Sequence, residues 1–194
     1  QESFKNGKVT TLPSVNTIAD GTAVKTPGSN IFPYIKKNLD DIITVEDDEL
    51  IVAFLDMVEN HKMIVENSGL LTVAALKHLG VKDKRVVSIL SGGNMDVITM
   101  SSVVQQGLIF RDRIFTVSVL LPDKPGELAK VSQTLADVQG NVIKLEHNQF
   151  VTTNRSAAVE LRITLECFGT EHKEQIIAAL EKKGYKPRIV RTMI

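Results

Sequence analysis

The chain has 194 residues, 43% of them hydrophobic, which is enough for one large or two small domains with real cores. Its 23 basic and 23 acidic residues balance, which argues against an electrostatically driven nucleic-acid partner. The single cysteine, Cys167, excludes an internal disulfide, favours a reducing, cytoplasmic compartment, and lies in an alternating apolar run that predicts burial. No apolar run approaches the roughly 18 residues of a membrane span. Because the chain begins at Gln1 without a signal-like segment, we expect it to be part of a longer protein.

The first 110 residues alternate short apolar runs with helix-like patterns. This alternation is typical of βα units and predicts a parallel sheet, which strands from outside this segment would complete. Residues 1–13 are polar and are expected to be irregular. Strands are expected at 41–45, 62–66 and 85–90, and helices at 30–39, 47–60, 70–79 and from about 94 to 106.

The third of these apolar runs ends in a chemically suggestive corner. Val86 to Leu90 reads as a buried strand and is followed by Ser91, Gly92 and Gly93. Ligands of open α/β sheets bind beyond the carboxyl ends of strands, where a hydroxyl or a closely approaching backbone can meet them. The alternative interpretation is a glycine-rich turn after a core strand.

The pattern changes at Arg113, after a predicted hinge over 107–112. Alternating apolar residues in 115–121 indicate a half-buried strand, and the elements that follow complete a βαββαβ order. That order is the ferredoxin-like unit with an antiparallel sheet. We therefore predict two domains, 1–110 and 113–194. The expected elements after the first strand are helix 127–138, strands 141–151 and 157–167 with a loop at 152–156, helix 171–183 and strand 186–191.

Three motifs in the first domain resemble one enzyme family. They are Ile18-Ala-Asp-Gly21 with Lys25-Thr-Pro27, Val65-Glu-Asn-Ser-Gly69, and Leu90-Ser-Gly-Gly-Asn94. In this order they resemble the carboxyl half of threonine dehydratases, also called threonine ammonia-lyases. These are relatives of serine racemase with the fold type II architecture of pyridoxal-phosphate enzymes, so a partial three-layer, parallel-sheet α/β domain is implied.

The second domain resembles an ACT domain, an α+β ferredoxin-like regulatory unit. Leu121-Pro-Asp-Lys-Pro-Gly-Glu-Leu128 and Gly140-Asn141 carry this resemblance. Together the two resemblances cover nearly the whole chain.

The first resemblance implies roles for individual residues. Ser91 would hydrogen-bond the pyridine nitrogen of pyridoxal phosphate, Glu66 would lie beside the ring, and Gly21 and Gly92 would approach the cofactor. Asn94, Lys62 and Asn30 match positions where some relatives hold a nucleotide activator, often across a dimer contact. Alternatives stay open: Glu66 and Lys62 can be an ordinary salt-bridged strand end, and Asn94 an ordinary helix cap.

The ACT resemblance implies a branched-chain amino-acid effector, isoleucine or valine. The turn before the helix at Glu127 leads to backbone N–H groups that can hold a carboxylate. Asn141 could offer its amide, and apolar residues could line a side-chain pocket. The alternative is that these are turn and cap residues only. The predicted effector residues are Asp123, Gly126, Glu127, Leu128, Asn141 and Ile143.

The departures from the family pattern are as informative as the matching motifs. Ser3-Phe-Lys5 looks like the Schiff-base lysine motif, but Asn6-Gly7 follows it instead of Arg-Gly-Ala, and it stands next to Ile18-Ala-Asp-Gly21. Lys5 is therefore not expected to be catalytic, and the tetraglycine phosphate loop is absent. We expect no catalytic residue and no metal site in this segment, because no histidine has metal-ligand spacing with carboxylates or Cys167.

These features predict a parent protein that deaminates L-threonine to 2-oxobutanoate and ammonia by pyridoxal-phosphate-dependent β-elimination. It would serve isoleucine biosynthesis or threonine catabolism as a cytoplasmic homodimer or tetramer under allosteric control. The segment alone is expected to be inactive and to lack the cofactor. The alternatives are an isolated amino-acid-binding module that oligomerises, and a serine dehydratase or racemase with the same site.

Overall fold

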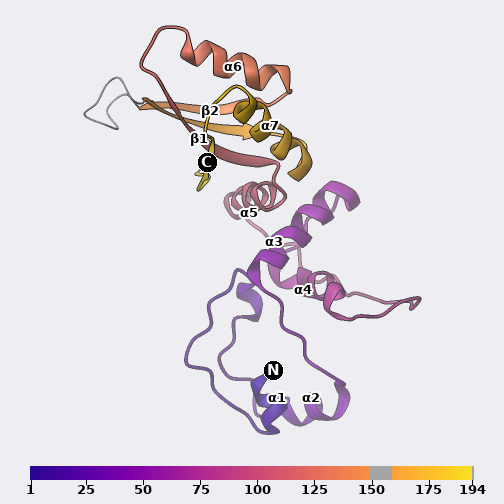
Figure 1. The fold of residues 1–194 in the computed structure, drawn as a ribbon. Helices are drawn as coiled ribbons and strands as arrows, with labels where there is room; N and C mark the ends of the chain where they lie inside the picture. Colours follow the sequence, from indigo (N-terminus) through magenta and orange to yellow (C-terminus); the bar gives the residue numbers. More distant parts are fainter. Residues whose placement is uncertain (149–158, 194) are drawn as a thin grey trace. The chain divides into compact units, whose positions relative to one another are not determined.

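The computed structural model describes residues 1–148 and 159–193 (Figure 1). The chain divides into two compact units, Gln1–Gly107 and Leu108–Ile194, and each is described by itself. The end of the strand predicted over 141–151, the loop at 152–156 and the start of the strand at 157–167 lie outside the described residues.

Unit 1 is built from helices and extended connections. Its core gathers around α3, whose Leu50 and Phe54 are fully enclosed together with Leu70 and Val65. The buried face of this helix also includes Ile51 and Leu55. The elements are α1 Glu2–Asn6, the 3₁₀ turn η1 Asp20–Thr22, α2 Phe32–Asn38, α3 Asp47–Asp56, the π-turn η2 Met57–His61, η3 Asn67–Leu70, α4 Leu71–Ala74, η4 Ala75–His78 and α5 Val97–Phe110.

The stretches predicted as strands in unit 1 form no β-ladder. Residues 41–45, 62–66 and 85–90 are all described, and none is assigned to a strand. Val87 is 89% exposed and Ile89 is 72% exposed, although their pattern is that of a buried strand. A parallel strand is stable only where neighbouring strands accept its backbone hydrogen bonds and helices cover its faces. In unit 1 no strand is assigned beside these runs, and only single residues such as Val65 are covered by the core, so the apolar pattern is present and the strand is not.

Two other predictions about unit 1 are wrong. Residues 2–6 form helix α1 instead of an irregular segment. The hinge predicted over 107–112 is helical along its first part, since α5 continues to Phe110. Gly107 lies against α3, and an added Cβ would come within 3.2 Å of the Leu55 Cδ2 atom. The glycine therefore serves close helix packing and not chain flexibility.

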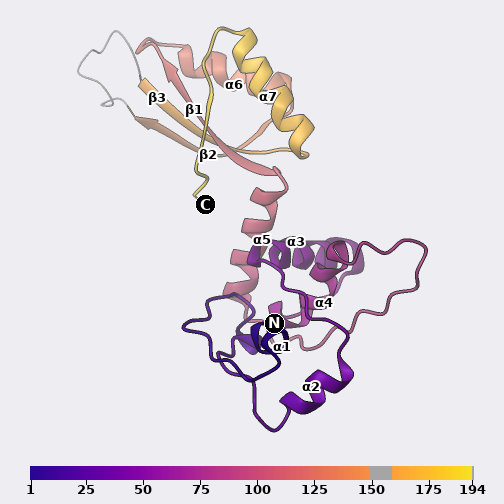
Figure 2. The same ribbon diagram turned by 60° about the horizontal axis from the view of Figure 1, so that its bottom comes forward.

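Unit 2 has the predicted βαββαβ order and an antiparallel sheet, as expected for the ferredoxin-like unit. Its strand order is β2-β3-β1-β4, so the two strands joined by the α6 crossover are not neighbours. Helices α6 and α7 lie together on one face of the sheet (Figure 2). The elements are β1 Ile114–Leu121, α6 Glu127–Asp137, β2 Asn141–Asn148, β3 Val159–Glu166, α7 Thr170–Lys182 and β4 Arg188–Val190.

The sheet separates apolar from polar side chains by the two-residue period of its strands. Val117 of β1 pairs with Ile163 of β3, and both belong to the core under the helices. On the opposite face, Thr116 and Thr164 share a hydrogen bond of 2.9 Å between their hydroxyls. The alternation in the sequence therefore selects which sheet face the helices cover.

The single cysteine is hydrogen-bonded to the segment that leads into β1. The Cys167 backbone N–H donates to the Arg113 carbonyl at 2.8 Å, and its thiol lies 2.8 Å from the Asp112 carbonyl oxygen. Burial raises the pKa of the Cys167 thiol above its ordinary value, so the protonated, unreactive form is favoured. The burial predicted from the sequence is confirmed.

Candidate functional site

The three motif segments of unit 1 meet at one corner. The Glu66 backbone N–H donates to the Gly92 carbonyl at 3.3 Å, which joins the second motif to the third. The Asn67 side-chain amide donates to the Ile18 carbonyl at 3.0 Å, which joins the second motif to the first. Segments separated by up to 49 residues in sequence are thus tied together directly.

Glycine is required where these segments touch. Gly92 has φ +77°, and a Cβ added there would lie 2.3 Å from the Glu66 carboxylate. A Cβ at Gly69 would lie 1.8 Å from the Ser91 carbonyl oxygen. At Gly21 it would lie 2.8 Å from the Ser68 hydroxyl oxygen. The predicted cofactor residues Gly21, Glu66, Ser91 and Gly92 therefore belong to one contact region.

Two buried side-chain atoms in this corner lack a partner among the described residues. The Asn67 side-chain oxygen Oδ1 and the Ser68 hydroxyl accept or donate no hydrogen bond within residues 1–148 and 159–193, and Asn67 is only 5% exposed. Leaving such a group unpaired costs about 1–3 kcal/mol, so it commonly marks a place that a ligand or water completes. Neither atom has a role in the site predicted from the sequence, because a short Asn-Ser-Gly run is equally typical of a turn.

The corner fits the ring side of pyridoxal phosphate. The Ser91 side chain is exposed at the end of its run, and Glu66 is half-buried beside Gly92. A hydroxyl and a carboxylate can meet a pyridine nitrogen and a ring edge. Lys5 lies exposed on α1, whose Ser3 hydroxyl accepts a 2.9 Å hydrogen bond from the Thr10 backbone. A local structural bond thus accounts for the serine of this lysine motif.

The predicted nucleotide residues are not brought together as a set. Asn94 lines a cavity of about 480 Å³ together with Glu66 and Asn67. Lys62 ends η2 with φ +57°, its ammonium bonded to the Glu59 carbonyl, and the exposed Asn30 precedes α2.

The cap alternative for Asn94 is wrong. Helix α5 is capped by Asp96, whose carboxylate accepts from the Ile98 and Thr99 backbone N–H groups at 3.0 and 2.9 Å. The Thr99 hydroxyl, which also donates to this carboxylate, and then these backbone N–H groups lower the pKa of Asp96.

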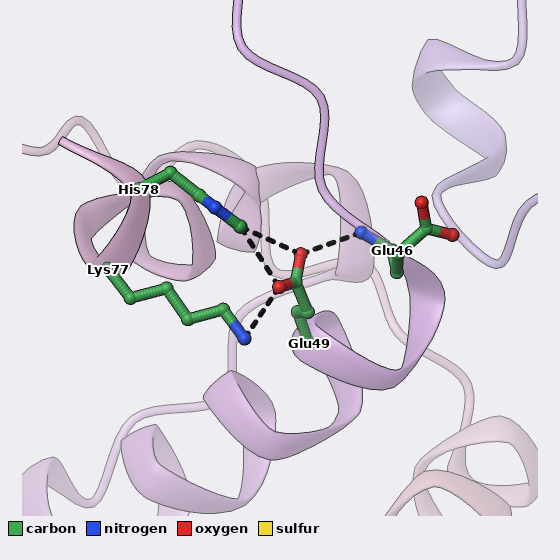
Figure 3. Close-up of polar contacts among 4 residues, drawn as sticks. All are labelled: Glu46, Glu49, Lys77 and His78. Atoms are coloured by element: carbon green, nitrogen blue, oxygen red, sulfur yellow. Dashed lines mark hydrogen bonds and ion pairs between the residues drawn. The ribbon is translucent and has the colours of Figure 1, made fainter.

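The first turn of α3 holds two parts of the corner. The Asp47 carboxylate accepts from the Thr17 hydroxyl at 2.5 Å and from the Ile18 backbone N–H at 3.1 Å. The Glu49 carboxylate lies 2.6 Å from the Lys77 ammonium and 2.9 Å from the His78 ring (Figure 3). The sequence analysis gave these acidic residues no site role, because acidic residues also simply suit a helix N-terminus.

The environment of Glu49 strongly favours its ionised form. The Lys77 ammonium, the Glu46 backbone N–H at 2.8 Å and the His78 ring, in that order, lower the pKa of Glu49 from 4.5 to about 2. Each partner donates to the charged carboxylate. The group is thus anionic over the whole physiological range.

The predicted effector residues of unit 2 lie around the start of α6 and of β2. Gly126 precedes α6 with φ +89°, and the exposed Asp123 lies in the turn before it. The Asn141 amide donates to the Glu166 carboxylate at 3.0 Å, and Glu127 pairs with Lys130 at 2.7 Å.

Leu128 and Ile143, the two apolar residues predicted to contact an effector, are exposed. Ile143 lies at an irregularity in the β2–β3 register, between Val142 and Lys144. Within the described residues, no group of three or more histidines, cysteines or carboxylates could hold a metal ion, and no helix could cross a membrane.

Comparison with known families places both units. Residues 1–92 match the family described as pyridoxal-phosphate dependent enzyme, and residues 115–184 match the ACT domain. The chain therefore joins part of a pyridoxal-phosphate-dependent enzyme domain to an ACT domain, and over nearly its whole length it is similar to threonine ammonia-lyases. The fold class predicted from the sequence is confirmed at this level.

Individual relatives show which enzymes of this kind the chain is similar to. The chain is 37% identical over 185 residues to the L-threonine ammonia-lyase of Geobacter sulfurreducens, covering 94% of this chain and 46% of the relative. It is 33% identical over 189 residues to the L-threonine ammonia-lyase of Thermotoga maritima, covering 97% of this chain and 47% of that relative. The chain spans about half the length of these relatives. A structure of processed threonine deaminase isoform 2 from Solanum lycopersicum matches with TM-score 0.51 and 28% identity, over 54% of this chain and 32% of that one.

We predict that Gly92→Ala destabilises unit 1 by about 1–3 kcal/mol, the usual cost of a left-handed backbone at a residue with a side chain. The new methyl group would also press on the Glu66 carboxylate. Urea unfolding followed by circular dichroism measures the loss. Gly93→Ala is the matched control, because the nearest atom to its Cβ is the Ile64 carbonyl oxygen at 3.5 Å. Equal loss in both variants would contradict the close contact.

Proposed function

We propose that the protein carrying this chain is a pyridoxal-phosphate-dependent threonine ammonia-lyase that converts L-threonine to 2-oxobutanoate and ammonia. The observation that carries the proposal is the meeting of three motif segments around Ser91, Glu66 and Gly21. Two relatives named L-threonine ammonia-lyase, which match 94% and 97% of this chain, support the substrate.

The residues of this chain would serve the ring of the cofactor. When bound, pyridoxal phosphate withdraws electrons from the substrate Cα and so acidifies its proton. The Ser91 hydroxyl would donate a hydrogen bond to the ring nitrogen, and this neutral donor leaves that nitrogen unprotonated. Glu66 would fix the ring edge, and Gly21 would let the backbone approach. The catalytic lysine and the phosphate loop would come from another part of the protein.

We further propose that unit 2 binds a branched-chain amino acid such as isoleucine or valine and regulates the enzyme. The first N–H groups of α6 follow the left-handed Gly126 and can receive a carboxylate. Leu128 and Ile143 are exposed apolar side chains that suit a branched aliphatic ligand. Such a ligand would link the protein to isoleucine biosynthesis; a role in threonine catabolism is the alternative.

The proposal includes a cytoplasmic homodimer or tetramer. Strand β2 lies at an edge of the sheet, and Val142 and Leu145 on it are exposed. An exposed apolar edge strand is a ready template for pairing with a second copy. The free, buried Cys167 supports a reducing compartment.

In the full-length protein, we predict that Ser91→Ala folds but binds pyridoxal phosphate up to about tenfold more weakly and deaminates threonine more slowly. A hydrogen bond of this kind contributes about 0.5–1.5 kcal/mol net, which sets that range. Cofactor titration and 2-oxobutanoate release from threonine and from serine provide the measurements. Ser88→Ala, three residues earlier in the same run, is the control. The proposed function fails if the wild type releases no 2-oxobutanoate from threonine.

For the effector site, isoleucine or valine is expected to raise the free energy of unfolding of the 194-residue chain. The expected gain is about 2.7 kcal/mol at a concentration 100 times the dissociation constant. Calorimetry and thermal melting check this, and Asn141→Ala is expected to weaken binding. Asn148→Ala is the control, because Asn148 also hydrogen-bonds a β3 carboxylate, Glu160, at the other end of β2. If millimolar ligand releases no heat and does not shift the melting temperature, the effector site is refuted.

A further inference from the structure

The acidic run Glu46 to Glu49 makes contacts beyond the start of its own helix. Two of its carboxylates reach out of α3 to different parts of unit 1, and both parts lead to the candidate cofactor corner. Asp47 contacts the first motif segment, and Glu49 contacts the far end of the helical run that begins at the second motif.

Asp47 fixes the approach to Gly21. Its two oxygens are used separately, one by the Thr17 hydroxyl and one by the Ile18 backbone N–H. The same Thr17 oxygen accepts from the Ala19 backbone N–H at 3.1 Å, and Ala19 is buried. Hydrogen bonds to a charged acceptor are about twice as strong as neutral ones. One carboxylate thus sets the path of the chain immediately before η1.

Glu49 contacts the far end of the helical run that starts at the second motif. The helical segments η3, α4 and η4 follow one another without a break over 67–78. Lys77 and His78 at the end of this run both point at the Glu49 carboxylate, as Figure 3 shows, and the Glu49 side chain is only 14% exposed. The run begins at Asn67, which returns to the Ile18 carbonyl. The contacts therefore close a ring through α3, the first motif and the second.

We propose that Asp47 and Glu49 are positioning residues for the cofactor corner. They hold the first and second motif segments at the separation that Gly21, Ser68 and Glu66 require. This inference rests on the proposed function for its catalytic consequence, but the ring of contacts is a property of unit 1 itself.

The chain contains a matched control for helix electrostatics. Asp48 lies between the two positioning residues in the same turn, carries the same charge and is exposed. If these acidic residues only complemented the helix dipole, Asp47→Ala and Asp48→Ala would have equal effects. If Asp47 positions the first motif, only its removal alters the segment 17–22.

Hydrogen exchange measured by mass spectrometry on the 194-residue chain tests this. Asp47→Ala is expected to accelerate exchange of the Ile18 and Ala19 amides by roughly 10–100-fold, the equivalent of losing hydrogen bonds to a charged group. Asp48→Ala is expected to leave them unchanged. Thr17→Val, which removes one bond to Asp47 without touching α3, provides the second variant if Asp47→Ala does not fold. Unchanged exchange, or equal acceleration in the Asp47 and Asp48 variants, would overturn the proposal.

A second readout separates this inference from the proposed function. In the full-length protein with pyridoxal phosphate, Asp47→Ala is expected to alter the visible absorbance of the bound cofactor. It should also lower kcat for threonine by at least about tenfold, with a smaller change in KM, because a displaced corner misaligns the ring. A wild type inactive on threonine, with the predicted exchange pattern intact, refutes the function alone. An active enzyme whose absorbance and kcat survive Asp47→Ala refutes the positioning role alone.

Discussion

Unit 1 depends on a pair of carboxylates in the first turn of one helix. Asp47 and Glu49 are half-buried in the turn that leads to the core residues Leu50 and Phe54, and each carboxylate is matched by at least two donors. The apolar face of α3 alone does little to orient the extended segments of the first and second motifs. Charge-assisted hydrogen bonds supply direction that apolar contact lacks, because they are short and angular.

The exposed apolar runs of unit 1 show what these carboxylates do not provide. The side chains of Val87 and Ile89 are exposed to solvent. An extended backbone forms a stable strand only when a neighbouring strand accepts its hydrogen bonds, and side-chain carboxylates elsewhere do not supply such a partner. Unit 2 shows the contrast. Its four strands pair within the unit, and the same two-residue alternation produces a closed core under α6 and α7. The chain thus combines a sheet whose strands all pair within unit 2 with apolar runs in unit 1 that have a strand pattern but no neighbouring strands.

The sequence allowed most of unit 2 to be predicted, because each signal there is local. Alternation in β1, the periodic face of α6 and the residues that end each element specify the fold without distant partners. In unit 1 the motifs predicted which segments matter, but not how they are held. The bonds from Asp47 to Thr17 and from Asn67 to Ile18 span 30 and 49 residues, and no periodicity encodes them. The sequence also leaves the cap of α5 open, since Asn94 and Asp96 are both good capping residues and the geometry selects the second.

The ionisation of Glu49 is the most direct test of these contacts in the first turn of α3, and a carbon-13 NMR titration of its carboxyl group measures it. The structure predicts a pKa of about 2, held down by Lys77, the Glu46 backbone N–H and His78. Because the folded pKa is depressed, the stabilisation is complete above the ordinary value of 4.5 and is lost as the pH falls towards 2. Lys77→Ala should move the pKa back towards 4.5. A Glu49 pKa near 4.5 in the intact chain would contradict the anchored acidic turn.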